Sequence, residues 1–220
     1  MNKLNECLIP LSGIIVFGSR PGMGLTTTTL KLANQIAQSK NVIFISYQDY
    51  EEKLLKILER HAEAVSRYLT INTSFDFYGD SFVQDISELM ASKSVDTVVI
   101  DDLDSMLGEY FDLEIRHRDM LLQKLQALTR VNNTRIILNV TVSQKVEYRN
   151  DSKKPMLRDF TWSRNLMGIA DQVYTIYRPE YYLLVEDENG KSTSGRIDID
   201  LIKDRECKEA QYIDFTTRNV

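Results

Sequence analysis

Strands of the fully buried kind alternate with helical patterns along most of this 220-residue chain. Five apolar runs have strand length and are rich in valine and isoleucine, which is typical of strands covered on both faces. They are Gly13–Phe17, Asn41–Ser46, Val95–Ile100, Thr134–Val142 and Gln172–Tyr177. Because parallel strands need crossovers between them, the alternation predicts an α/β fold with a mostly parallel central sheet flanked by helices.

Helical periodicity accounts for most of the sequence between these runs. The predicted helices are Thr26–Gln38, Tyr50–Tyr68, Ser81–Ser92, Asp112–Val131 and a short one near Asn165. Ser143–Arg158 shows no periodicity, and we predict a loop there.

The C-terminal part follows a different pattern. In Arg196–Ile202, apolar residues alternate with Asp198 and Asp200, which predicts a half-exposed antiparallel strand. Asn189-Gly190 supplies turn chemistry before it. We therefore expect an antiparallel extension of the sheet and, since no linker or repeat interrupts the chain, a single domain over residues 1–220.

Composition limits the class of protein. The net charge of -5 and the pI near 5.2 argue against a protein that coats duplex DNA with a broad basic face, although a local basic loop remains compatible with them. Cys7 and Cys207 are far apart in the sequence and lack metal-ligand spacing, so neither a disulfide nor a zinc framework is expected. Without a run long enough to span a bilayer, we expect a cytoplasmic protein with no membrane partner.

A glycine-rich turn joins the first predicted strand to the first helix. The context fits a phosphate-binding loop, because glycines let backbone N–H groups turn toward phosphate oxygens at a helix N-terminus. The candidate nucleotide-binding residues are Ser19, Arg20, Pro21, Gly22, Met23, Gly24, Leu25, Thr26 and Thr27. The alternative is a turn that only connects the two elements.

Two positions of this loop depart from the G-x-x-x-x-G-K-[ST] pattern: Ser19 replaces its first glycine and Leu25 its lysine. Leu25 cannot neutralise charge on the β- and γ-phosphates as the lysine would. Arg20, or a cation from another chain, is a candidate replacement. Gly24 and Thr26 fit the pattern, and the Thr26 hydroxyl is a candidate ligand of Mg²⁺.

Asp101 ends the predicted strand Val95–Ile100, where a magnesium-coordinating carboxylate belongs. Taken alone, this residue can equally be an ordinary helix or turn cap. Paired with Thr26, it predicts one shared Mg²⁺ site.

The second half of the chain resembles the motor domain of DnaB-type replicative helicases. The matching segments are Ser143-Gln144, Val146–Arg149, Lys154–Asp159, Ala170–Val173 and Tyr177–Tyr182, in the family's order and spacing. Arg20–Gly24 resembles the family's phosphate loop, and Lys203-Asp204-Arg205 its K-x-R element. The resemblance implies a RecA-like P-loop NTPase fold, ATP with Mg²⁺ as ligand, and a ring of neighbouring RecA-like subunits that moves along single-stranded DNA.

The resemblance also implies roles for single residues. Gln144 matches the glutamine that senses the γ-phosphate, and Lys203 and Arg205 match cations that reach the nucleotide of the neighbouring subunit. We expect both cations to project to one side of an edge strand. The predicted DNA contacts are Lys145, Arg149, Lys153, Lys154 and Arg158. From the residues alone, two solvated surface charges are the favoured interpretation of Lys203 and Arg205. For the five cations of the basic loop, a solvated loop explains the sequence as well as DNA contacts do.

Departures from the family bear on activity. The family's catalytic glutamate, at the end of the second strand, corresponds to Gln48, and an amide cannot accept a proton from water at neutral pH. With Leu25 and Gln48 both changed, we expect slow or absent ATP hydrolysis. The family's glycine after K-x-R is also missing. Because the first strand starts near Gly13, we expect neither the family's N-terminal domain and linker helix nor a stable hexamer from this chain alone.

Two functions from different classes remain open at this level. One is an ATP-driven DNA helicase motor. The other is a non-catalytic nucleotide-binding or ring-associating module that modulates a true helicase. A recombinase-like RecA relative is disfavoured by the match over Ser143–Tyr182.

Overall fold

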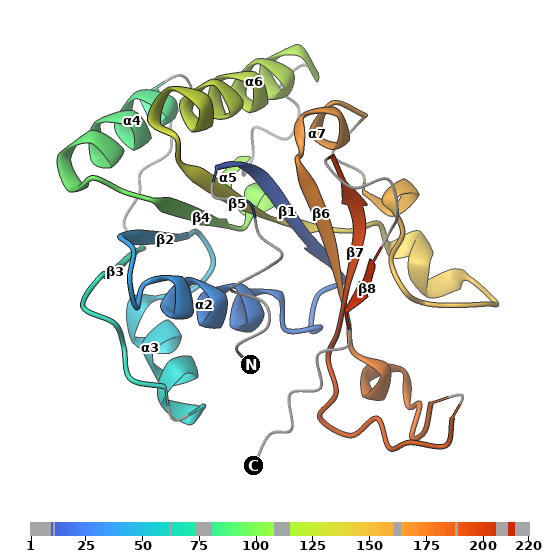
Figure 1. Ribbon diagram of the computed structural model, residues 1–220. Helices are drawn as coiled ribbons and strands as arrows, with labels where there is room; N and C mark the ends of the chain where they lie inside the picture. The colour runs from blue at the N-terminus through green and yellow to red at the C-terminus, as the bar shows by residue number, and fades with distance from the viewer. Residues whose placement is uncertain are drawn as a thin grey trace.

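The computed structural model describes residues 10, 12–61, 63–73, 81–107, 115–160, 164–187, 189–205 and 211–213. Over these residues the chain forms one sheet with the strand order β3-β2-β4-β5-β1-β6-β7-β8 (Figure 1). The strands are β1 Gly13–Ser19, β2 Val42–Ser46, β3 Leu69–Asn72, β4 Thr97–Asp101, β5 Arg135–Thr141, β6 Gln172–Tyr177, β7 Asp198–Asp204 and β8 Gln211–Ile213. The pairs among β1 to β6 are parallel, whereas β7 and β8 extend the sheet antiparallel.

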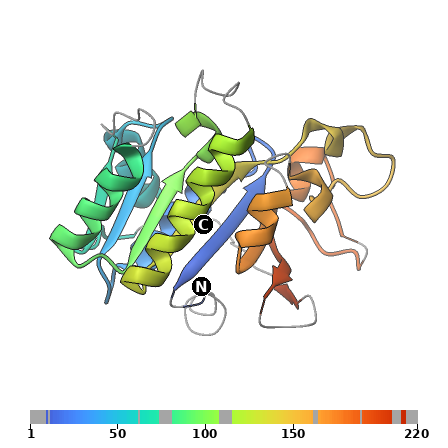
Figure 2. The same cartoon turned by 90° about the horizontal axis from the view of Figure 1, so that it is seen from above.

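Helices cover both faces of the sheet. The α-helices are α2 Leu25–Ile36, α3 Glu51–Arg60, α4 Ser81–Lys93, α5 Leu103–Leu107, α6 Ile115–Asn132 and α7 Arg164–Ile169. One core cluster joins the sheet to α4, α5, α6 and α7, and a second joins it to α2 and α3. The view from above shows α4 and α6 running along the strands (Figure 2). No helix within the described ranges is long and apolar enough to cross a membrane.

The predicted sheet and its antiparallel extension are confirmed, and most elements lie where the periodicity indicates. The predicted helix over Tyr50–Tyr68 is too long, because α3 ends at Arg60 and the short strand β3 follows at Leu69. The predicted loop Ser143–Arg158 contains two 3-10 turns, η2 Gln144–Tyr148 and η3 Leu157–Asp159. The predicted helix start, Asp112 to Glu114, lies outside the described residues.

The last long strand differs from the prediction in bounds and in exposure. It runs over Asp198–Asp204, and Asp198 is only 2% exposed, whereas the alternation predicts a solvated aspartate. Its carboxylate forms ion pairs with Arg196, at 2.6 Å, and with Lys154, at 3.0 Å. The carboxylate is buried because Arg196, just before β7, and Lys154, from the loop after β5, cover it.

Parallel strands place their carboxyl ends at one edge of the sheet. The glycine-rich turn after β1, Gln48 after β2, Asp101 at the end of β4 and Gln144 after β5 therefore share that edge. Lys203 pairs with the start of β6, so the K-x-R residues lie at the opposite edge.

Candidate nucleotide site

The phosphate loop has the backbone that a glycine-rich anion site requires. Gly22 and Gly24 adopt positive φ values of 83° and 84°, which residues with a Cβ rarely reach. Gly24 caps α2 without any side-chain hydrogen bond, and no acidic residue lies in the first turn. Amide donors at the start of a helix are free of intrahelical partners, so the start of α2 can donate to phosphate oxygens.

Thr26 and Asp101 meet at this site. The Thr26 hydroxyl donates to Oδ1 of Asp101 over 3.1 Å, and Asp101 is 2% exposed. Its second oxygen, Oδ2, is buried and has no hydrogen-bond partner among the described residues. Burial raises the pKa of Asp101 to about 6, partly offset by the hydrogen bonds from Asn139 and Thr26. An orphaned carboxylate oxygen beside a threonine hydroxyl fits a hard cation such as Mg²⁺.

Asn139 belongs to the same cluster, although it is not among the predicted site residues. Its Nδ2 donates to Oδ1 of Asp101 over 2.6 Å and to the Thr29 hydroxyl over 2.8 Å. The residue is fully buried in β5. A lone amide inside the apolar run Thr134–Val142 is the signal that could have identified it, because a buried polar group needs a partner.

Gln48 is tied to a carboxylate that the sequence-based prediction also misses. Its Nε2 donates to Oδ2 of Asp102 over 3.0 Å and to the Ser105 hydroxyl over 2.6 Å. The other oxygen of Asp102 accepts from the backbone of Ser105 over 2.6 Å, which caps the short helix α5. The position of the family's catalytic glutamate therefore holds an amide whose donors are engaged by Asp102 and Ser105.

Arg20 does not fill the place of the missing lysine in this conformation. Its Nε pairs with Glu147 over 2.8 Å, and its Nη1 donates to the carbonyl of Val142 over 2.8 Å. Leu25 itself packs against the core cluster below α2. The structure therefore offers no support for the predicted compensating role of Arg20.

The predicted DNA-contact residues separate into two groups. Arg149 pairs with the buried Asp159, Lys153 donates to the carbonyls of Glu147 and Arg149, and Lys154 pairs with Asp198 and Asp200. Arg149 and Lys153 stabilise the loop itself, and Lys154 ties it to β7. Lys145 and Arg158 are exposed, as is Gln144 at the start of η2.

Lys203 and Arg205 point to the same side, as predicted, but β7 is not an edge strand, since β8 pairs with it over Ile199–Leu201. Lys203 donates to the carbonyls of Met167 and Ala170, and Arg205 to those of Gly168 and Ile169. Both cations thereby satisfy carbonyls at the C-terminus of α7.

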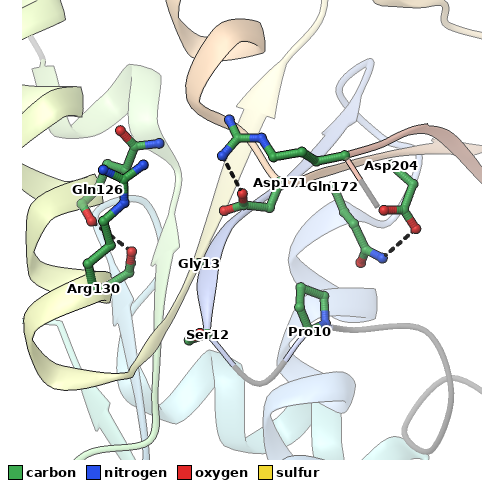
Figure 3. A pocket seen from close by; sticks show the side chains of 10 residues that line it. Pro10, Ser12, Gly13, Gln126, Arg130, Asp171, Gln172 and Asp204 are labelled. Carbon is green, nitrogen blue, oxygen red and sulfur yellow. Dashed lines mark hydrogen bonds and ion pairs between the residues drawn. The ribbon is translucent and has the colours of Figure 1, made fainter. Parts of the chain in front are cut away.

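Arg205 also lines a pocket at the edge of the sheet opposite the phosphate loop. The pocket has a volume of about 220 Å³, and Arg205 and Asp171, which both line it, form an ion pair at 2.7 Å. In Figure 3, Gln126 and Arg130 of α6 lie on one side of Gly13. Gln172 and Asp204, which are joined by a hydrogen bond, lie on its other side. The K-x-R side chains lie near the start of β6, whereas the phosphate loop follows the far end of the parallel strand β1. These cations therefore cannot contact a nucleotide bound at the phosphate loop of their own chain.

Comparisons with known proteins bear on the family and the fold of the chain. The family model for the DnaB-like helicase C-terminal domain matches residues 51–216, three quarters of the chain. The replicative DNA helicase DnaB of Mycoplasma genitalium is 24% identical over 198 residues, covering 75% of this chain and 42% of that protein. The chain therefore spans less than half the length of this curated relative.

Solved structures share the fold. One solved ATPase domain superposes with a TM-score of 0.73 at 20% identity, over 94% of this chain and 82% of that one. A DnaB-like replicative helicase, described with its interactions with primase, superposes with a TM-score of 0.70 at 18% identity. The match covers 91% of this chain and 53% of that one. A KaiC-like protein of Pyrococcus horikoshii superposes with a TM-score of 0.65 at 15% identity, over 94% of this chain and 84% of that one. These likenesses confirm the RecA-like fold, and with the family match they show that this chain belongs to the DnaB-like helicase C-terminal domain family.

Proposed function

We propose that this chain is a helicase motor domain that binds ATP with Mg²⁺ and single-stranded DNA and that hydrolyses ATP slowly or not at all. The observation that carries the proposal is the Thr26–Asp101 pair beside an uncapped helix start, with a buried carboxylate oxygen left without a partner among the described residues. Mg²⁺, when bound, would supply charge neutralisation at the phosphates.

Different residues at the phosphate loop would contact the phosphates, the cation and the attacking water. Free backbone N–H groups of the turn and of the first turn of α2 would hold the phosphate oxygens. The Thr26 hydroxyl and Oδ2 of Asp101 would hold the cation, and Asn139 would fix the Asp101 carboxylate. Gln144, exposed after β5, would contact the γ-phosphate. Gln48 would orient water without accepting its proton.

Partners would be single-stranded DNA and neighbouring RecA-like subunits, either copies of this chain or a true helicase ring. Lys145 and Arg158, as exposed cations, would contact DNA phosphates, so binding would weaken with salt. Lys203 and Arg205, at the edge opposite the phosphate loop, would serve a neighbour's nucleotide. Leu25 stands in place of the lysine, and Gln48 is hydrogen-bonded to Asp102. Both features favour a second candidate, a non-catalytic module that modulates such a ring.

Steady-state ATPase measurements with and without single-stranded DNA separate the two candidates. For a weak motor, we expect turnover that rises with DNA and is lost in Arg205→Ala, while Arg130→Ala, an exposed arginine on the same pocket, is the matched control and keeps it. Nucleotide binding with no turnover under any condition would support the module. Turnover that persists in Arg205→Ala would contradict the role in trans.

A further inference from the structure

The 3-10 turn η2, Gln144–Tyr148, presents an aromatic ring to solvent beside a cation. Tyr148 is 75% exposed, and Lys145, three residues before it, is exposed as well. Side chains three residues apart in a 3-10 helix lie above one another, so Lys145 and Tyr148 share one face of η2. Val146 is fully buried and anchors the turn to the core. The exposed face of η2 therefore combines a flat ring with a positive charge.

The turn is fixed on both sides of Tyr148. The preceding residue, Glu147, forms an ion pair with Arg20 of the phosphate loop at 2.8 Å. The following residue, Arg149, pairs with the buried Asp159. A group on a preorganised turn loses little conformational freedom when it binds a partner. Tyr148 is thus an exposed ring on a turn that already has a defined position.

A second exposed cation lies on the neighbouring turn η3, Leu157–Asp159. The ion pair between Arg149 and Asp159 joins η3 to the residue that follows Tyr148, and Arg158 precedes Asp159. Arg158 is exposed, as Lys145 is on η2. Cations contact phosphates of any nucleic acid, whereas an aromatic ring stacks on bases that a single strand leaves accessible. The two turns together therefore offer groups for the backbone and for a base.

From this juxtaposition we propose that Tyr148 stacks on a base of the bound single strand while Lys145 and Arg158 contact its phosphates. The inference rests on the proposed function, because it needs single-stranded DNA at the loop after β5. Phosphate contacts alone carry no information about the bases, whereas the ring needs an unpaired base. Every base has a π-face, so we expect a preference for strands that carry bases, with little dependence on sequence.

Fluorescence anisotropy of labelled oligo(dT) and of an abasic strand of the same length, titrated with the full chain in Mg²⁺ and ATP, tests this inference. The wild type should bind oligo(dT) about tenfold more tightly than the abasic strand, in line with the usual strength of base stacking. Tyr148→Ala should lose this preference and leave the abasic strand unaffected, whereas Tyr148→Phe should keep it. Tyr68→Ala, a partly exposed tyrosine before β3 at the opposite edge of the sheet, is the matched control.

The salt dependence of binding separates the ring from the cations. Lys145→Ala should weaken both strands alike and make the slope of log affinity against log salt concentration shallower by about 0.7. Tyr148→Ala should leave this slope unchanged, because stacking releases no counterions. A change of slope in Tyr148→Ala would show that the ring acts by positioning the cations, which contradicts the base contact.

Each further contrary outcome has a separate meaning. If the wild type binds the abasic strand as tightly as oligo(dT), the base contact is refuted while DNA binding stands. If Tyr148→Ala weakens both strands equally, the ring only supports the loop, and the base contact is again refuted. If neither strand binds, the proposed DNA binding fails together with the inference.

Discussion

Asp101→Asn is expected to raise the free energy of unfolding of the nucleotide-free protein at pH 7, by up to about 3 kcal/mol. Folding buries the Asp101 carboxylate and raises its pKa from 3.8 to about 6. Between these values the unfolded state has lost the proton while the folded state still holds it. Wild-type stability therefore falls as the pH rises through this window, and an uncharged amide removes that loss.

Urea unfolding from about pH 3.5 to about pH 7.5 measures the effect as a difference between variant and wild type. The two proteins should be closest near pH 4 and differ most above pH 6. Asp151→Asn, on the exposed part of the loop after β5, is the control and should follow the wild type. Mg²⁺ with ATP should stabilise the wild type and not Asp101→Asn. A variant with the wild-type pH dependence would show that Asp101 does not titrate as its burial implies.

Gln48→Glu together with Leu25→Lys is expected to give little ATP hydrolysis until Asp102 is also replaced. The Gln48 amide donates to Oδ2 of Asp102 over 3.0 Å, so a glutamate there would face a second carboxylate. Two carboxylates at this distance hold one proton between them, which raises one pKa and disables the introduced base. Asp102→Asn removes the conflict and keeps an oxygen to accept from the backbone of Ser105.

Steady-state ATPase rates of the single, double and triple variants measure this effect. Relative to the wild type, the triple variant should gain about 10²- to 10⁴-fold, the usual contribution of a positioned general base. Asp102→Asn alone is the control and should not gain. A triple variant that binds ATP but hydrolyses it no faster than the wild type would contradict the proposal that Leu25 and Gln48 limit hydrolysis.

The parallel sheet can be predicted because its strands are continuous runs of β-branched residues, which need no tertiary information to be recognised. The strand β3 escapes such a prediction because Leu69–Asn72 is only four residues long, alternates with polar residues and follows a helical pattern without a break. The buried aspartate of β7 escapes it for a different reason. Lys154, which pairs with Asp198, is distant in the sequence, and local alternation carries no such information.

The site is predictable in part for similar reasons. The Thr26–Asp101 pair can be predicted because a strand, a glycine-rich turn and a helix follow one another and because Asp101 ends a strand. The structure shows the two side chains in contact at 3.1 Å. The roles of Asn139 and Asp102 depend on the neighbouring strands β4 and β5 and on the cap of α5, so no local pattern reveals them. The basic loop looks like five equivalent cations in the sequence, yet three of them, Arg149, Lys153 and Lys154, fold back onto the chain.

The central claim is that the turn between β1 and α2 holds the phosphates of a nucleotide while Thr26 and Asp101 share one Mg²⁺. Calorimetric titration of ATP into the wild type and Thr26→Ala, each with Mg²⁺ and with a chelator, tests it directly. We expect one ATP bound per wild-type chain, dependence on Mg²⁺, and loss of that dependence in Thr26→Ala. Absence of binding to the wild type, or binding that responds neither to Mg²⁺ nor to Thr26→Ala, would contradict it.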